Sequence, residues 1–140
     1  LLKYIYYLDE YDDPLQEKDV SSSIVFNNNI RLSRFNESIL SDTKIMLFFC
    51  PINGRFKNGK SLSDDDFLLD IVIPNHYWLI NKNTKIRAFE MAREIAISID
   101  QQRIAGIGYV EIIQYQTQII GQEYQGISMI LRTSNASLKL

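Results

Sequence analysis

Only one stretch of this chain has the residue spacing of an amphipathic helix, and this limits the fold more than any other feature. Across residues 84–100 the polar side chains recur along a single stripe and apolar ones fill the rest. The polar set is Arg87, Glu90, Glu94, Ser98 and Gln101, and the apolar set is Ile86, Phe89, Ala92, Ile95, Ala96 and Ile99. Asn83 or Thr84 is expected to cap the first turn by accepting a backbone N–H bond. The remaining chain must therefore be mainly strands and loops.

Four further segments have the character of strands. Residues 44–50 are apolar on both faces and end at Pro51, and residues 67–73 form a second apolar, β-branched run that ends at Pro74. Residues 113–119 alternate strictly between apolar or hydroxyl side chains and glutamines, with the period of two that a half-exposed strand requires. Gly121 then marks a turn region before a second alternating run at 127–131, which predicts a C-terminal hairpin.

These segments predict one α+β domain over residues 1–140, with a mainly antiparallel sheet and one long helix packed across it. The length of 140 residues and the hydrophobic content of 46% suit a single core. The sheet and helix are expected within residues 44–133. Residues 1–40 have no clear period, and residues 21–29 indicate a short strand at best.

Charge and cysteine content exclude several classes of protein. The net charge is −2 with 15 basic and 17 acidic residues, so the basic surface of a nucleic-acid binder is absent. The single cysteine, Cys50, lies in an apolar run and is expected to be a small buried side chain in a reducing compartment. No apolar run approaches the roughly 20 residues that span a bilayer, which predicts a soluble, cytoplasmic protein without a membrane partner.

Residues 54–61 match the spelling of a phosphate-binding P-loop, with two glycines four residues apart followed by Lys60 and Ser61. A working P-loop continues into a helix whose N-terminus binds the phosphate. Here three aspartates and a strand-like run follow instead, and Asn53-Gly54 and Asn58-Gly59 are turn signals. We therefore expect a hairpin connection or exposed finger between residues 50 and 67, and no nucleotide cofactor.

Other candidate chemistry is equally weak, so no enzyme activity, catalytic residue or metal site is predicted. His76 is the only histidine, which rules out metal pairs built from two histidines. The carboxylates at Asp64, Asp65 and Asp66 are consecutive and do not converge as in a calcium loop, so a solvated acidic loop is favoured. Tyr77 and Trp78 lie in a polar loop, where they would form either a protein interface or a lid folded onto the core.

The order of these pieces resembles the tail-terminator or tail-completion (head-tail joining) proteins of tailed bacteriophages. Those proteins have a hydrophobic strand, a long turn, a strand that ends in proline, one long helix and a closing antiparallel pair. The matching segments here are residues 44–50, 69–74, 86–95, 110–119 and 127–133.

This resemblance implies a non-enzymatic virion protein of the phage tail or neck, assembled in the host cytoplasm. Such a protein forms a ring, typically a hexamer, that caps the tail tube and joins it to the head connector. The tail-tube and head-connector proteins are the implied partners, and DNA is only passing cargo. In such a ring Arg55, Lys57 and Lys60 would contact an acidic neighbour, while Asp64, Asp65 and Asp66 would repel DNA phosphates from a lumen.

Two alternatives remain from the residues alone. One is a small partner-binding module of the inhibitor or immunity type, which a strictly monomeric mass would favour. The less favoured one is a P-loop-like nucleotide binder, which would require nucleotide binding that Lys60→Ala abolishes.

Overall fold

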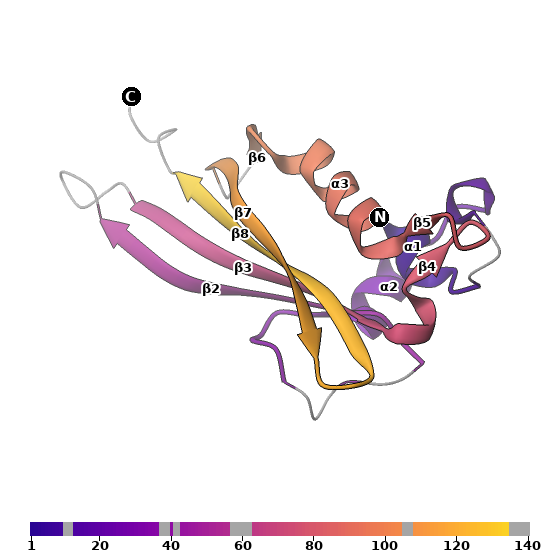
Figure 1. Ribbon diagram of the computed structural model, residues 1–140. Coiled ribbons are helices and arrows are strands. Elements are labelled where there is room, and N and C mark those ends of the chain that lie inside the picture. The colour runs from indigo at the N-terminus through magenta and orange to yellow at the C-terminus, as the bar shows by residue number, and fades with distance from the viewer. Residues whose placement is uncertain (10–12, 37–39, 41–42, 57–62, 105–107, 135–140) are drawn as a thin grey trace.

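The computed structural model describes residues 1–9, 13–36, 40, 43–56, 63–104 and 108–134. A six-stranded sheet forms the centre of the molecule, in the order β1-β2-β3-β8-β7-β6 (Figure 1). Only the β1–β2 pair is parallel, and the four other pairings are antiparallel. The strands are β1 (Ile30–Arg31), β2 (Met46–Phe56), β3 (Ser63–Pro74), β6 (Gln102–Ile104), β7 (Gly108–Ile120) and β8 (Tyr124–Ser134).

The helices are short and gather toward one end of the sheet (Figure 1). They are α1 (Leu2–Tyr6), α2 (Ser22–Asn29) and α3 (Arg87–Ile99), with 3₁₀ turns η1 (Pro14–Gln16) and η3 (Asn75–Tyr77). A two-stranded ribbon, β4 (Leu79–Ile80) with β5 (Lys85–Ile86), precedes α3. The α+β class and the mainly antiparallel sheet are confirmed, but the single long helix is wrong because α3 has 13 residues and two other α-helices accompany it.

The start of α3 differs from the expected cap. Asn81, Lys82 and Asn83 form a left-handed turn with φ of 53°, 57° and 61°. The Thr84 hydroxyl donates to the carbonyl of Asn81 and does not cap the helix. The helix instead begins after Ile86, where the Arg87 N–H donates to the Trp78 carbonyl at 2.8 Å. A contact with the preceding 3₁₀ turn thus replaces the side-chain cap.

Residues 21–29 contain α2, so the expected short strand is wrong there. Three consecutive apolar residues are too few to display a period of either two or 3.6. Only Val25 of this helix is buried, and two asparagine amides make further contacts. The Asn28 side chain donates to the Ile24 carbonyl, and the Asn29 side chain reaches the Ile45 carbonyl at the start of the sheet.

Strand β2 also runs farther than expected, because Pro51 does not end it. The β2–β3 register shifts between Pro51 and Asn53, and pairing then continues to Phe56. Proline has no N–H to donate. It is tolerated at this point of β2 because, among the described residues, β3 is the only strand that pairs with β2 here. Much of the segment expected to be a finger is therefore a hairpin of two paired strands.

The main core lies between the sheet and α3. Leu47, Ile71, Ile127 and Met129 are buried from the sheet, with Met91 among the residues that meet them from the helix. The opposite face carries a smaller cluster of Met46, Phe48 and Val72, partly covered by Phe35 and Tyr124. The early part of β2 is therefore covered on both faces, as its composition predicts, and Cys50 is buried with 6% exposure.

Candidate assembly interface

Strand β7 forms one edge of the sheet over most of its length. Strand β6 pairs with it only at residues 108–110, and the Asp100 carboxylate accepts the N–H of Ile112 at 2.8 Å. Within the described chain, no strand covers residues 113–120 on the side away from β8. We call residues 113–120 the β7 edge. An uncovered edge strand of this length presents unpaired backbone groups to another chain.

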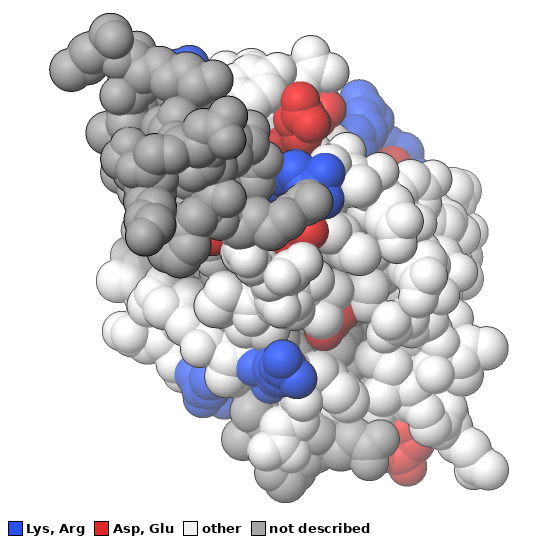
Figure 2. Space-filling view, turned by 90° about the vertical axis from the view of Figure 1, so that its left-hand side faces the viewer, with Lys and Arg blue, Asp and Glu red and all other residues white. Residues whose placement is uncertain are grey.

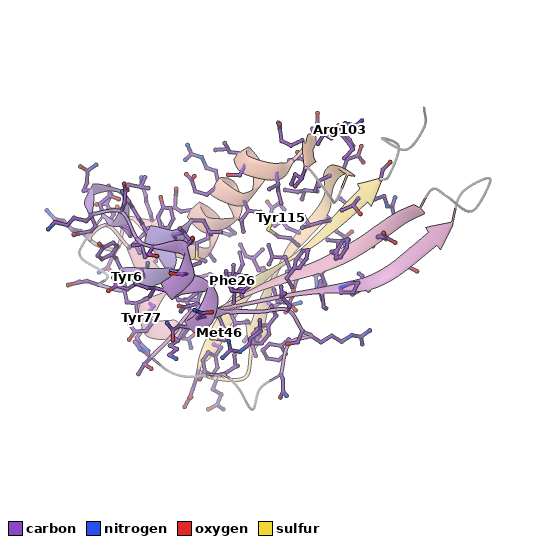
Figure 3. The ribbon with its side chains drawn as sticks, turned by 180° about the vertical axis from the view of Figure 1, so that it is seen from behind. Tyr6, Phe26, Met46, Tyr77, Arg103 and Tyr115 are labelled. Carbon is purple, nitrogen blue, oxygen red and sulfur yellow. The ribbon has the colours of Figure 1, made fainter. Side chains whose placement is uncertain are left out.

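The apolar side chains of the β7 edge are unusually exposed. Tyr115 is 63% exposed and Ile119 is 83% exposed. Register places Tyr115 opposite Met129 and Thr117 opposite Ile127, so these side chains belong to the face that carries α3. Figure 3 shows Tyr115 on that side of the strands. The helix is too short to cover this part of the strand.

An apolar groove of about 800 Å³ lies between α3 and the β7 edge. Phe89, Ala92 and Ala96 line its helix side, and Ile112, Ile113 and Tyr115 line its strand side. Phe89 and Ile113 are each about two-fifths exposed, at 42% and 43%. The right-hand side of the face in Figure 2 carries few charged side chains. An apolar surface beside an open edge is typical of protein–protein contact sites.

The opposite edge of the sheet is open as well. Strand β1 pairs with β2 only at Leu47 and Phe48, and within the described residues nothing pairs with the outer side of 49–56. We call residues 49–56 the β2 edge. Three antiparallel pairings separate β2 from β7, so the two strands run in opposite directions (Figure 1).

One row of side chains across the sheet carries alternating charges. Asp66 on β3 lies opposite Arg132 on β8, and Arg132 lies opposite Glu111 on β7. The Arg132 guanidinium donates to both carboxylate oxygens of Asp66, at 2.9 and 3.2 Å. Asn53 on β2 occupies the same row on the other side of Asp66.

The face of the sheet opposite α3 contains a polar depression. Asp70 and Ser128 are buried there and face each other across β3 and β8, and the Ser128 hydroxyl donates to the Asp70 carboxylate. Gln114, Gln116 and Gln118 line the same depression from β7. Burial raises the pKa of the Asp70 carboxyl above its ordinary value, although the hydrogen bond from Ser128 lowers it.

Replacing Asp70 with asparagine is expected to stabilise the protein at neutral pH. The folded state binds the Asp70 proton more tightly than the unfolded chain, so its stability falls as pH rises through the folded pKa. Asparagine keeps an acceptor for Ser128 and carries no charge. We expect a gain of about 1 kcal/mol at pH 7, which is about 4 °C in melting temperature.

Thermal melts of both proteins between pH 3 and pH 7 test this expectation. The difference should vanish below about pH 4, near the ordinary pKa of an aspartate, where both side chains are neutral. Equal melting temperatures at pH 7, or a less stable Asp70→Asn protein, would contradict it.

Arg87 holds the N-terminal segment to α3. The sequence assigns it to the polar stripe of the helix, but the structure buries it completely. Its Nε donates to the Tyr77 carbonyl at 2.8 Å, and its Nη1 donates to the carbonyls of Tyr4 and Tyr7 at 2.7 and 2.8 Å. Burial lowers the pKa of Arg87 to about 10, so the side chain remains charged at neutral pH. Its contacts are structural and reach no open surface site.

The basic residues proposed for contacts are only partly described. Arg55 lies in β2 opposite Asp64, whereas Lys57 and Lys60 fall outside the described residues. Asp64, Asp65 and Asp66 are strand residues of β3, between β2 and β8, so the acidic loop expected there is wrong. Asp66 is engaged by Arg132.

The P-loop spelling also falls on strand structure where it is described. Gly54 and Arg55 are paired residues of β2, and β3 begins at Ser63. The two strands of the hairpin expected in place of a P-loop are therefore present: β2 precedes residues 57–62 and β3 follows them. Residues 57–62 themselves lie outside the described residues.

Tyr77 and Trp78 are part of the molecule's own packing. Both are partly buried against the main core, and their backbone carbonyls accept hydrogen bonds from Arg87. This is the lid arrangement rather than a free interface. His76 is exposed, with its ring 4.0 Å from that of Tyr77. Among the described residues, no group of three histidine, cysteine or acidic side chains could hold a metal ion.

Sequence reasoning missed the residues that line the groove. The sequence pattern places Phe89 and Ile113 on apolar faces. Such a pattern does not reveal whether a neighbouring element covers an apolar residue or leaves it exposed. The available signal was the alternation of Tyr115, Thr117 and Ile119 with three glutamines, in a segment without any charge. Natural edge strands are usually protected by charges, so an uncharged edge indicates a partner.

A comparison with known protein families identifies the family of this chain. The sequence matches the family described as YomW over residues 1–133. The chain belongs to the YomW family. This match covers every strand of the YomW fold except the last residue of β8. A search among curated proteins gave no match to this YomW chain. No described helix of this protein is long and apolar enough to cross a membrane.

Proposed function

We propose that this YomW-family protein is a structural subunit that assembles with copies of itself into a ring. The observation that carries the proposal is the uncharged β7 edge, which lies beside an apolar groove and has no covering strand in the described chain. An open edge of this kind promotes aggregation of a monomeric protein. In an assembly subunit the same edge forms the contact, because a second chain pairs with its backbone N–H and C=O groups.

The chemistry of the described surface also favours assembly over catalysis. The two buried polar side chains opposite α3, Asp70 and Ser128, bind each other. The groove is lined mainly by apolar side chains, and Asp100, one of its polar residues, is engaged by the backbone of Ile112. Nothing in this lining provides a nucleophile with an adjacent base.

The particular ring we propose is a tail terminator in the neck of a tailed bacteriophage, joining the tail tube to the head connector. The support is the order of elements: a buried strand, a long hairpin, a strand that ends at Pro74, an amphipathic helix and a closing hairpin. A hexamer is the expected ring size. The test of this finer proposal is binding to the tail-tube protein encoded in the same genome, measured by co-sedimentation.

Light scattering on the purified protein tests self-assembly. We expect a mass that is a multiple of the 16.3 kDa subunit. Gln116→Lys places a charge in the middle of the β7 edge and is expected to weaken assembly at least about tenfold, because the lysine must stay solvated. The matched control is Gln122→Lys in the exposed turn after β7, which should assemble normally.

Circular dichroism should show that both variants remain folded. A strictly monomeric wild-type protein at all concentrations, also in the presence of tail-tube protein, would refute the ring and favour a partner-binding module. Assembly of Gln116→Lys at the wild-type level would remove the β7 edge from the interface.

A further inference from the structure

We propose that the β7 edge binds the β7 edge of a second copy of this chain, in an antiparallel pairing centred on Thr117. This inference rests on the proposed self-assembly and specifies the contact at this edge. Residues 114–120 of one copy would lie alongside residues 114–120 of the other, running in the opposite direction. Thr117 would then face Thr117 of the second copy across a two-fold axis.

Two hydrogen bonds show which backbone groups of β7 point away from β8. The Val110 carbonyl accepts a hydrogen bond from the N–H of Gln101 at 2.8 Å. The Ile112 N–H donates to the Asp100 carboxylate, also at 2.8 Å. Neither Gln101 nor Asp100 belongs to β8, so residues 110 and 112 direct their backbone groups to the outer side of the strand.

A bulge at Ile113 then fixes the outward residues of the β7 edge. Ile112 lies opposite Leu131 and Gln114 lies opposite the adjacent residue of β8, so Ile113 is the extra residue. Successive pairs of an antiparallel ladder alternate between bonded and unbonded, so Gln114 binds β8. The backbone groups that point outward beyond the bulge are those of Tyr115, Thr117 and Ile119.

The pairing centred on Thr117 joins the two most exposed apolar side chains of the edge. Tyr115 is 63% exposed and would lie opposite Ile119 of the second copy, which is 83% exposed in the single chain. Symmetry repeats this pair and places the two Thr117 side chains opposite each other. Aromatic with β-branched and threonine with threonine are favourable cross-strand pairs. A pairing centred on Gln116 would instead leave Ile119 beside the bulge at Ile113.

The uncovered segment also fits its own copy in length and charge. Asp100 covers the outer side of β7 at Ile112, and the chain leaves the strand at Gly121. Residues 112–122 contain no charged side chain, so the pairing places no like charges opposite each other. The flanking glutamates, Glu111 and Glu123, lie outside the paired residues.

The area of this contact reaches what a specific interface needs, which is about 1,000 Å² in total. A tyrosine side chain buries about 200 Å², so the 63% exposed Tyr115 contributes about 130 Å². Ile119 offers a similar area, and these side chains from both copies together give about 500 Å². The other half is roughly 35 Å² per paired residue, which the edge backbone and the glutamines supply.

The contact joins the two copies in one continuous sheet. Cross-strand neighbours share a face, so α3 of both copies lies on the same side and the two apolar grooves flank the paired strands. A two-fold contact uses the same surface on both copies and closes on itself. A ring built through this contact therefore consists of pairs, and the expected hexamer is three pairs joined through a second surface.

Cysteine cross-linking tests the two-fold axis. The Cα atoms of the two Thr117 residues would be about 5.5 Å apart, which is within the range of a disulfide. With oxidised glutathione, Thr117→Cys is expected to form a disulfide-linked dimer at least about tenfold faster than Gln114→Cys. The two Gln114 positions would be six residues apart along the strands, or about 20 Å. Wild-type protein gives the background, since its only cysteine, Cys50, is buried.

A mixture of two variants tests the register. Tyr115→Cys and Ile119→Cys should form a disulfide with each other when mixed, because these positions face each other in the pairing. Neither variant alone should cross-link, because like positions would be four residues apart along the strands, or about 13 Å.

A charge at Ile119 tests the contact without cross-linking. Ile119→Lys is expected to raise the dissociation constant of the assembly at least about tenfold, because the lysine would have to pack against Tyr115 of the second copy. The matched control is Ile97→Lys on α3, where the isoleucine is 64% exposed and lies outside the groove lining. This control should assemble like the wild type. Melting temperatures show whether each variant is folded.

The outcomes separate this inference from the proposed function. If the wild-type protein assembles but Thr117→Cys cross-links no faster than Gln114→Cys, the two-fold pairing is refuted and self-assembly stands. The same conclusion follows if Ile119→Lys assembles like the wild type. If only the mixture fails to cross-link, the register is wrong. If the wild-type protein is monomeric throughout, both proposals fail together. Cross-linking at Thr117 and in the mixture supports the pairing.

Discussion

Replacing Arg87 with methionine is expected to destabilise the protein by about 3–5 kcal/mol, a large part of the stability of a domain this size. The methionine fills much of the volume but leaves the carbonyls of Tyr4, Tyr7 and Tyr77 buried without their donor. Lysine should recover only part of the loss, because one ammonium group cannot reproduce the planar fork of the guanidinium.

Chemical denaturation measures this loss, and limited proteolysis locates it. We expect new cleavage within residues 1–20, since Arg87 joins α1 to the helix that covers the sheet. The matched control is Arg93→Met on the same helix. The Arg93 side chain is largely exposed, and its ion pair with Glu90 is loose, with 3.7 Å between the nitrogen and the carboxylate oxygen. That change should cost less than about 0.5 kcal/mol. Similar costs at the two positions would refute the structural role of Arg87.

Replacing Gly126 with alanine is the second change with a large expected effect. Gly126 lies in β8 opposite Val72 of β3, at the centre of the sheet. A methyl group there would overlap the backbone carbonyl oxygen of Ile71 and lie 3.1 Å from its carbonyl carbon. Backbone in a central strand cannot move aside without opening the ladder on both of its sides. We expect a loss of about 3 kcal/mol, measured by urea denaturation.

Gly121 provides the control for Gly126. It occupies the turn between β7 and β8 with φ of +64°, and an added methyl group would meet nothing within 4 Å. Gly121→Ala is therefore expected to cost only about 1 kcal/mol, from the left-handed backbone alone. If Gly126→Ala is no more destabilising than Gly121→Ala, then β3 and β8 do not approach as closely as described.

The parts of this fold that follow from sequence are those with a complete period. The amphipathic pattern of α3 and the alternation of the C-terminal hairpin each repeat often enough to identify their element. Helix α2 could not be predicted, because only Val25 of its residues is buried and its position is set by contacts such as that from Asn29 to Ile45. Arg87 was misassigned because periodicity treats every charge as exposed, whereas this one binds backbone carbonyls.

The candidate interface was predictable only in part. Residues 114–118 carry no charged side chain, and this is the one signal of an open edge that the sequence contains. Periodicity cannot say which strand lies at an edge, because strand order depends on contacts between distant segments. The row of Asp66, Arg132 and Glu111 likewise needs the register of three strands, and residues 64–66 alone resemble a solvated acidic loop.

The hydrogen bonds from Arg87 to the N-terminal segment affect how that segment can evolve. The guanidinium binds the main chain of residues 4 and 7, so it recognises where the segment passes and not which side chains it carries. The Tyr7 hydroxyl donates to the Lys18 carbonyl at 2.9 Å, so a substitution at position 7 removes that bond but leaves the attachment to Arg87 intact if the backbone keeps its path. Among relatives we therefore expect the arginine to be retained more strictly than the residue at position 7.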